Sequence, residues 1–99
     1  MSLYKVYITP TANREIEASP GFVRQRIKRA IKALRDDPRP PGSKELDVPD
    51  IDRELRRLTL DKCRVIYAIT ETENIVDVFA VRKRPPYDYG DLEKLLAGI

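Results

Sequence analysis

The side chains that could do chemistry in this chain are those of arginine, lysine, tyrosine and the acidic residues. The sequence has no histidine and one cysteine, Cys63, so it cannot form a Ser-His-Asp or Cys-His catalytic site or an internal disulfide. Zinc sites built on His and Cys spacing are excluded for the same reason. Arginine chemistry remains, because a guanidinium holds anionic oxygens through paired N–H donors. We therefore expect no metal ion and no cofactor.

The basic residues are concentrated in three segments, although the net charge is only +3. Residues 24–35 contain six Lys or Arg and no acid, residues 53–64 contain five against two acids, and residues 82–84 are all basic. Segregated positive charge favours a polyanion such as nucleic acid as partner. A basic helix is also the ordinary solvated face of a protein, and charge alone leaves both interpretations open.

Length and composition predict a single domain spanning residues 1–99. A chain of 99 residues, 41% apolar and 35% charged, can bury one modest core. Its longest uninterrupted apolar run, residues 65–69, is far shorter than the roughly 20 residues that cross a membrane. The N-terminus shows no secretory signal, so we expect a cytoplasmic protein without membrane association.

Hydrophobic periodicity predicts an ordered series of strands and helices. The stripe of Val23, Ile27, Ala30, Ile31 and Leu34 has helical spacing and should face the core, which leaves the basic residues of that helix in solvent. Proline and glycine end this helix and make residues 36–42 a stiff connector, followed by an expected loop at 43–52. Strands are expected at about 3–9, 54–60, 63–70 and 75–82, and helices at about 12–18 (capped by Thr9 or Thr11), 21–35 and beyond Asp88 or Asp91.

These elements predict an α+β fold in two layers. The sheet should be four-stranded and rich in antiparallel pairs, with an N-terminal helical hairpin on one face and a short C-terminal helix. Tyr67 and Cys63 are expected in the core as strand residues. The side chains of Val65, Tyr67, Ile69, Val76, Val78 and Ala80 are expected to line buried faces.

Four segments resemble RelE/ParE-family toxins of bacterial toxin–antitoxin modules. They are YKVYITP at residues 4–10 (with Ala12 and Arg14-Glu15-Ile16 after it), DPRPPGSKEL at 37–46, RVIY at 64–67, and VRKR at 81–84 followed by a tyrosine. The segments occur in the family's order and cover essentially the whole chain. The resemblance implies a cognate antitoxin as partner, and it implies one of two activities, because the family has two branches on one fold.

RelE-like members cut mRNA on the ribosome, whereas ParE-like members poison DNA gyrase. Carried over by position, the catalytic residues of the RelE branch fall on Arg57, Arg64, Arg84 and Tyr87. Thr59 stands where the family often has a second basic residue, and this departure counts against the nuclease branch. Asp61 and Cys63 replace a frequent glycine and aromatic residue, and they affect the expected hairpin geometry.

The resemblance gives these residues roles in RNA cleavage by the neighbouring 2′-hydroxyl. Tyr87 would act as the base, since surrounding cations favour the phenolate, and Tyr89 is close enough to be the working tyrosine instead. Arg64 and Arg84 would hold the non-bridging phosphate oxygens, while Arg57 would position the backbone or assist protonation. Alternatively, Arg64 and Arg84 pair with Glu54, Asp77 or Asp88, and Tyr87 packs on the prolines before it.

The favoured function is therefore a metal-independent, ribosome-dependent mRNA endoribonuclease, with ribosome, mRNA and antitoxin as partners. The alternatives are a gyrase inhibitor without nuclease activity and an inactive member that only binds its antitoxin. The residues expected to contact ribosome or RNA are Arg26, Arg29, Lys32, Lys44, Arg56, Lys62, Arg82 and Lys83.

Overall fold

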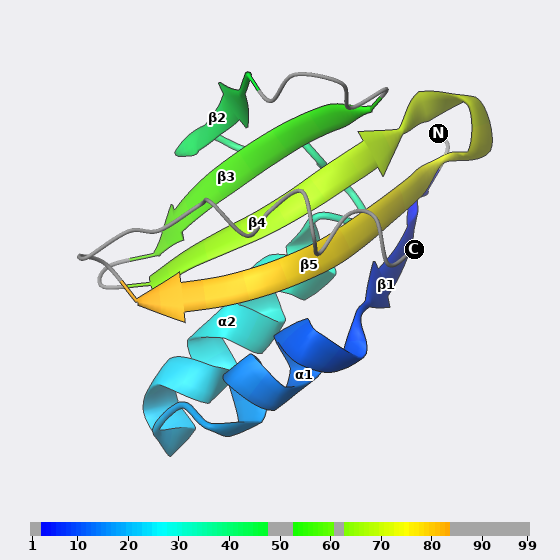
Figure 1. Cartoon of the computed structure of the whole chain (residues 1–99). Coiled ribbons are helices and arrows are strands. Elements are labelled where there is room, and N and C mark those ends of the chain that lie inside the picture. The colour runs from blue at the N-terminus through cyan, green and yellow to red at the C-terminus, as the bar shows by residue number, and fades with distance from the viewer. Residues whose placement is uncertain (1–2, 48–52, 61–62, 84–99) are drawn as a thin grey trace.

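The computed structural model describes residues 3–47, 53–60 and 63–83 of the chain. Its elements confirm the α+β class expected from the sequence (Figure 1). In chain order they are β1 (Lys5–Ile8), α1 (Pro10–Glu17), α2 (Gly21–Ala33), β2 (Ser43–Leu46), β3 (Glu54–Leu60), β4 (Cys63–Thr70), the 3-10 turn η1 (Glu71–Glu73) and β5 (Ile75–Lys83).

The strands form one sheet in the order β1-β5-β4-β3-β2 (Figure 1). The pairs β2–β3, β3–β4 and β4–β5 are antiparallel, while β1 runs parallel to β5 because the helical hairpin carries the chain back before β2 begins. The central strands β4 and β5 are the longest, so the core and the candidate site both depend on them.

The sheet has five strands, and the expectation of four was wrong. The additional strand β2 lies within residues 43–52, which we expected to be a loop, and it pairs with β3 from Ser43 opposite Leu58 to Leu46 opposite Leu55. It is an edge strand of four residues with two exposed charged side chains at its centre, so its sequence carries almost no alternation. Gly42 has φ 93° immediately before β2, a backbone conformation that favours glycine.

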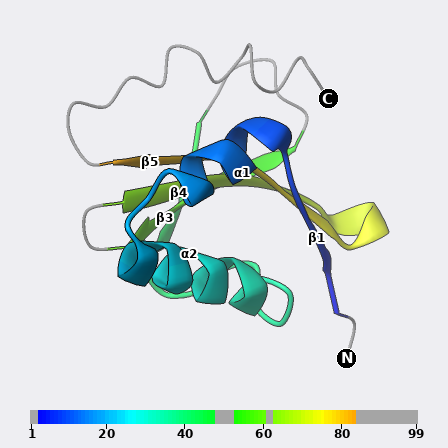
Figure 2. The same ribbon diagram turned by 90° about the horizontal axis from the view of Figure 1, so that it is seen from below.

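Helix α2 packs on one face of the sheet, α1 lies along β5, and both contribute side chains to the same core (Figures 1 and 2). Helix α1 begins at Pro10, and Thr9 is its cap: the Thr9 Oγ1 accepts the Ala12 N–H at 3.2 Å. The predicted stripe of α2 is confirmed, since Ile27, Ile31 and Leu34 are buried and its other members pack at the edge of the core.

The main core lies between the helices and the central strands. Val65, Tyr67 and Ile69 of β4 contribute one row of it, and the expected core positions of Tyr67 and Cys63 are confirmed. The Tyr67 hydroxyl donates to the Pro38 carbonyl at 2.7 Å, so this buried group is satisfied and the stiff connector is tied to the sheet.

The expected C-terminal helix lies outside the described residues. None of the helices in the described ranges is long and apolar enough to cross a membrane.

Candidate functional site

A one-residue irregularity in the β4–β5 ladder determines which side chains of β5 reach the face opposite the helices. Tyr67 pairs with Val78 but Ile66 pairs with Ala80, so Phe79 is an extra residue and the alternation of β5 shifts by one. Beyond this bulge Val81 faces the helices, where strict alternation would place Ala80. Ala80 is buried, as expected, but it is Val81 that joins the helix-side core.

The same shift brings three arginines together on the face opposite the helices. Arg64 of β4 is directly opposite Arg82 of β5, and Arg57 of β3 pairs with Ile66, one position along the same face from Arg64. We call Arg57, Arg64 and Arg82 the arginine row. Side chains directly opposite in a sheet lie roughly 5 Å apart, so the row concentrates positive charge on three adjacent strands.

Arg57 has a chemical feature that points to an anionic ligand. Its Nε is buried and has no hydrogen-bond partner among the described residues. A buried donor without a partner is costly, and a phosphate oxygen would satisfy it with a charge-assisted bond. Like charges facing one another across strands also destabilise a sheet, which a bound polyanion would relieve.

Glu15 of α1 holds the strand that carries Arg82. Its Oε1 accepts the Val81 N–H at 3.0 Å, and its Oε2 lies 3.6 Å from the Arg82 Nε. Since β1 pairs with β5 only as far as Val78, this carboxylate bonds to the edge of β5 at a position that no strand of the described residues reaches. Glu15 therefore fixes the end of β5 beside the arginine row.

Of the three carboxylates expected as alternative partners of these arginines, Asp77 and Glu54 are bonded to other arginines, Glu54 lies on the opposite face of β3 from Arg57, and Asp88 lies outside the described residues. Asp77 bonds to Arg53 at 3.2 Å, and the Arg53 guanidinium also lies 5.6 Å from the centre of the Phe79 ring. Glu54 accepts from Arg39 at 2.8 Å and from Arg56 at 2.8 Å. The hydrogen bond from Arg39 is the main reason that the pKa of Glu54 lies below its usual value.

Arg39 is the centre of a polar network at the far end of the sheet. It joins Glu54 of β3 to Glu71 of η1, and Glu71 in turn accepts from the Tyr4 hydroxyl at 2.9 Å. Hydrogen bonds from Arg39 and then from Tyr4 lower the pKa of Glu71, while the bond to Glu71 raises the pKa of Tyr4. The network ties the connector after α2 to β3, to η1 and to Tyr4 immediately before β1.

The other sequence-predicted contact residues do not all join the row. Arg56 lies on the opposite face of β3 from Arg57, where it bonds to Glu54 and to the Ser43 Oγ. Arg26, Arg29 and Lys32 are exposed on α2, Lys44 is exposed on β2, and Lys83 is the last residue of β5. Arg84, Tyr87, Tyr89 and Lys62 lie outside the described residues.

Two features of this site were absent from the sequence reasoning. Glu15 is an ordinary surface glutamate by sequence, and only the fold brings it to β5. The bulge could have been suspected from the run Val78-Phe79-Ala80-Val81, which is apolar throughout and fits no strict alternation.

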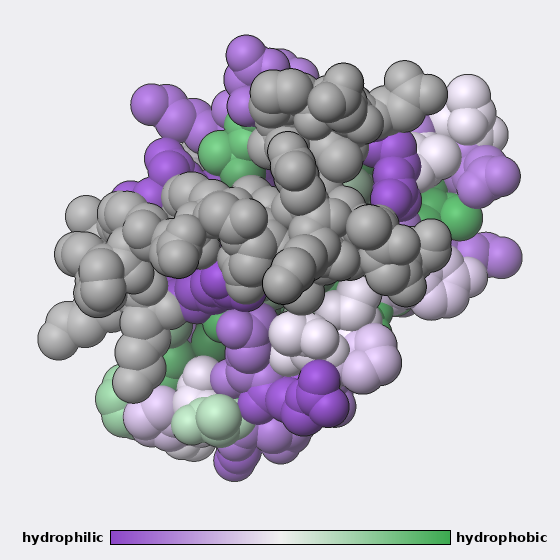
Figure 3. Space-filling model, viewed as in Figure 1, coloured by the Kyte–Doolittle hydropathy of each residue, from purple (hydrophilic) through white to green (hydrophobic). Residues whose placement is uncertain are grey.

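Hydrophilic residues are visible around the rim of the face of the molecule that Figure 3 shows.

The described residues contain no group of three or more His, Cys, Asp or Glu side chains placed to hold a metal ion. The arrangement can instead bind anionic oxygens, because its functional groups are guanidinium donors on rigid strands.

Comparison with known protein families shows to which family the chain belongs. The family model for the ParE toxin of the type II toxin–antitoxin system, parDE, matches residues 6–85. The chain belongs to this family. The resemblance to RelE/ParE-family toxins noted in the sequence is confirmed.

Solved toxin structures share the fold. One chain of the archaeal RelE–RelB complex from Pyrococcus horikoshii superposes with a TM-score of 0.76 at 20% identity, covering 86% of this chain and 99% of that one. The isolated RelE toxin of E. coli gives 0.68 at 21% identity, with 94% and 98% covered. The RelBE2 toxin–antitoxin complex of Mycobacterium tuberculosis gives 0.71 at 20% identity, with 83% and 99% covered. No curated protein sequence matches the chain significantly.

Proposed function

We propose that this ParE-family toxin is a metal-independent, ribosome-dependent mRNA endoribonuclease that acts in the cytoplasm and is neutralised by a cognate antitoxin. The observation that carries the proposal is the arginine row, in which Arg64 and Arg82 face each other and Arg57 has a buried donor without a partner among the described residues. A structural role does not require like charges at these positions, whereas an RNA backbone supplies an anionic oxygen for each of them.

In this proposal the row holds the RNA backbone and stabilises charge on phosphorus. Arg57 and Arg64 contact the phosphate from β3 and β4, and Arg82 extends the contact along β5. Arg84 and Tyr87 complete the site according to the family resemblance, with Tyr89 as the alternative tyrosine. The described residues provide the binding part of the site, and the proton-transfer part belongs to residues after β5.

The reaction balances without a metal ion. The 2′-oxygen of one nucleotide attacks the adjacent phosphorus while its proton passes to the tyrosine, and the 5′-oxygen of the next nucleotide leaves as the P–O bond breaks. The leaving oxygen takes up a proton from the site or from water. Arginine donors stabilise the extra negative charge that develops on the non-bridging oxygens between these two events.

Similar solved structures support an antitoxin as partner. The similar structures from P. horikoshii and M. tuberculosis are toxin–antitoxin complexes. We propose the same kind of partner here, and the ribosome and its mRNA as the target.

Inhibition of DNA gyrase is the second candidate. Two observations favour it: the matching family model is that of ParE toxins, and Thr59 stands opposite Arg64 where nuclease members often carry a basic residue. Under this alternative the arginine row would contact an acidic protein surface, and no bond would be cleaved.

A paired assay separates the two candidates. The purified chain is added to translating ribosomes with a defined mRNA, and cleavage is mapped by primer extension; the same preparation is tested for inhibition of gyrase supercoiling. The proposal predicts ribosome-dependent cuts that Arg57→Ala and Arg64→Ala abolish, with supercoiling unaffected. Supercoiling blocked without any cleavage would establish the gyrase function, and neither effect would indicate the inactive, antitoxin-binding alternative.

A further inference from the structure

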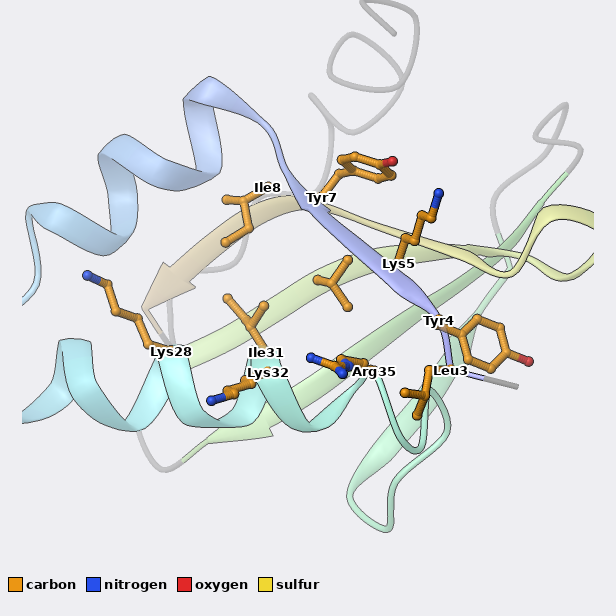
Figure 4. A pocket seen from close by; sticks show the side chains of 10 residues that line it. Leu3, Tyr4, Lys5, Tyr7, Ile8, Lys28, Ile31, Lys32 and Arg35 are labelled. Carbon is orange, nitrogen blue, oxygen red and sulfur yellow. The ribbon is translucent and has the colours of Figure 1, made fainter. Parts of the chain in front are cut away.

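Tyr7 of β1 places an aromatic ring on the same face of the sheet as the arginine row. Val6 pairs with Val76, which belongs to the helix-side core, and Tyr7 pairs with Asp77. Because side chains alternate along a strand, Tyr7 points to the face opposite the helices. Figure 4 shows its side chain turned away from α2, with that of Lys5 beside it. The edge strand therefore adds an aromatic and a cationic side chain to the face of the row.

The three tyrosines in the described part of the chain differ in how the fold uses them. Tyr67 is fully buried and its hydroxyl donates to the Pro38 carbonyl. The Tyr4 hydroxyl donates to Glu71 at 2.9 Å. Tyr7 is 52% exposed, so much of its ring is accessible to a ligand.

The surface between Tyr7 and the row can admit a polyanion. Asp77 is the acidic side chain directly beside Tyr7, and its carboxylate is bonded to Arg53 at 3.2 Å, which compensates its charge. The floor of this surface consists of buried apolar side chains, those of Leu55, Ala68 and Phe79. A negatively charged chain that crosses from Tyr7 to the row therefore passes an ion pair and an apolar floor.

The register of the sheet gives the distance from Tyr7 to the row. Tyr7 is aligned with Leu55 of β3 through three strand pairings, and Arg57 lies two residues further along β3. With strands about 4.8 Å apart and a rise of about 3.3 Å per residue, Tyr7 lies roughly 16 Å from Arg57. An extended single strand covers this distance in about three to four nucleotides, comparable to the smallest sites of single-strand-binding proteins.

We propose that Tyr7 is a base-stacking residue for single-stranded RNA that lies across the arginine row, and that Lys5 contacts the phosphate beside the stacked base. The inference rests on the proposed function, because it takes RNA as the ligand of the row. Guanidinium donors hold the backbone, while the ring of Tyr7 receives a base a few nucleotides away. Since every base has an aromatic face, this contact fixes the position of the strand and does not select a sequence.

The combination of an aromatic ring with the row selects a single strand over a duplex. The bases of a duplex are stacked on one another and offer no free face to Tyr7, whereas an extended strand does. An acidic protein surface would satisfy the arginines in the same way, but it carries no base to stack on the ring.

A tryptophan at this position would report stacking directly, because the sequence contains no other. The probe is 2′-O-methyl decauridylate, which cannot be cut since its 2′-oxygens are methylated. At saturation it should lower the fluorescence of Tyr7→Trp by about half or more, because a base stacked on the indole quenches it.

Ile8→Trp is the matched control for this measurement. Ile8 is the next residue of β1 and is 40% exposed, but it pairs with Val78 and faces the helix side of the sheet. The same oligonucleotide should lower the fluorescence of Ile8→Trp by less than about a tenth. Equal quenching of the two variants, or none in Tyr7→Trp, would overturn the proposal.

Removing the ring and removing the hydroxyl should have different effects on affinity. Tyr7→Ser loses the stacking surface and should bind the labelled oligonucleotide about tenfold more weakly in fluorescence anisotropy, whereas Tyr7→Phe should stay within about twofold of the unaltered chain. Circular dichroism of both variants verifies that they are folded. An equal loss in Tyr7→Phe would assign the contact to the hydroxyl, and full binding by Tyr7→Ser would show that no contact exists; either result overturns stacking.

Loss of the row should separate Tyr7 from the RNA. When Arg57→Ala is introduced into Tyr7→Trp, the midpoint of the quenching titration should move to at least about tenfold higher oligonucleotide concentration. An unchanged midpoint would show that RNA reaches Tyr7 without the row and would overturn the shared site.

A peptide probe separates RNA from an acidic protein surface. Decaglutamate has a charge similar to that of the oligonucleotide but no bases, so it should bind at least about tenfold more weakly and leave the fluorescence of Tyr7→Trp unchanged. Tighter binding of decaglutamate would assign the row to an acidic protein and overturn RNA as its ligand.

These binding measurements use no ribosomes, so failure of the stacking residue and failure of the nuclease are distinguishable. Quenching of Tyr7→Trp by the oligonucleotide, in a chain that cuts no mRNA on translating ribosomes, would support the stacking residue and refute the nuclease. Cleavage by Tyr7→Ser at the rate and ribosome affinity of the unaltered chain would overturn the role of Tyr7 and leave the nuclease intact.

Discussion

Glu15 of α1 accepts the backbone N–H of Val81 on β5 at 3.0 Å, and so links the helical hairpin to the strand that carries the arginine row. The contact is made where β1 no longer covers the edge of β5. The Glu15 carboxylate therefore continues the hydrogen bonding along the edge of β5 after β1 has ended. The second carboxylate oxygen of Glu15 lies 3.6 Å from the Arg82 Nε. The position of Arg82 thus depends on a residue 67 positions earlier in the chain.

Substitution of Glu15 should affect the two contacts differently. Glu15→Gln retains an oxygen acceptor for the Val81 N–H but loses the charge beside Arg82, whereas Glu15→Ala loses both. We expect Glu15→Ala to lower the free energy of unfolding by about 1–2 kcal/mol and Glu15→Gln by less, with denaturant unfolding as the measurement. Faster exchange of the Val81 amide in Glu15→Ala alone would confirm the cause, and equal stability of both variants would contradict it.

We expect Arg57 to lower the stability of the fold while being required for cleavage. Its Nε is buried without a partner among the described residues, and the neighbouring side chains on its face include the buried Leu55 and Ile66. Arg57→Leu should therefore raise the free energy of unfolding by about 1 kcal/mol while removing most cleavage.

Arg57→Lys is the matched control for this prediction. It retains the charge but lacks the forked donors, so we expect it to recover only part of the cleavage rate. A loss of stability in Arg57→Leu, measured by thermal unfolding, would show that Arg57 supports the fold and does not serve a ligand.

The sequence predicted the layers of this fold better than the details of its face. The stripe on α2 and the apolar strands β4 and β5 are strong periodic signals, because each buries a continuous set of side chains. The edge strand β2 is too short and too exposed for such a signal. The bulge at Phe79 follows from the fit between two strands, so the apolar run around it indicates an irregular strand but does not specify the position of the extra residue.

The sequence likewise predicted part of the candidate site, and the fold determined the rest. Arg57 and Arg64 were placed from the family resemblance, and the register of β3 and β4 brings them to one face. Arg82 joins them only because the bulge shifts β5, and Arg56 leaves the set because it lies on the other face with Glu54 and Ser43. Side-chain partners of this kind depend on tertiary packing, which the sequence does not report directly.

The basic face of α2 should govern binding to the ribosome. Arg26, Arg29 and Lys32 are exposed, so replacing all three with glutamate should leave the fold intact and weaken ribosome association, with a shallower dependence on salt. Binding measured by sedimentation across a salt series is the test. Identical binding by the triple variant and the unaltered chain would return α2 to the role of a solvated face.

The Arg39 network should make the fold sensitive to acid. Hydrogen bonds from Arg39 lower the pKa values of Glu54 and Glu71, so both carboxylates stabilise the folded state above their unfolded pKa. This stabilisation is lost as the pH falls through their folded pKa values, in the range below about pH 4.5. The share of Glu54 should be about 1 kcal/mol, since the pair is partly exposed to solvent.

Arg39→Gln should flatten this pH dependence. Melting temperatures measured from pH 7 down to pH 3 should fall less steeply in Arg39→Gln than in the unaltered chain, although the variant starts from a lower value. Arg29→Gln removes an exposed arginine outside the network and should leave the profile unchanged. Parallel profiles for Arg39→Gln and the unaltered chain would show that the network does not carry the acid sensitivity.

The proton-transfer step should depend on residues that follow β5. If Arg84 stabilises the phosphorane-like transition state and a tyrosine accepts the 2′-hydroxyl proton, Arg84→Ala and Tyr87→Phe should each remove most cleavage and leave ribosome affinity nearly intact. The phenylalanine keeps the ring and deletes only the hydroxyl, so it separates chemistry from folding. Arg84→Lys should recover part of the rate, because one ammonium lacks the paired donors of arginine.

Two further measurements discriminate within this chemistry. Cleavage should rise with pH as more tyrosinate forms, provided that proton abstraction limits the rate. Tyr89→Phe is the matched control: it should cleave at nearly the unaltered rate if Tyr87 is the base, and the reverse pattern would move the role two residues along the chain. Normal cleavage by both tyrosine variants would show that neither tyrosine is the essential base, and the proton of the 2′-hydroxyl would then have to pass to another group or to water.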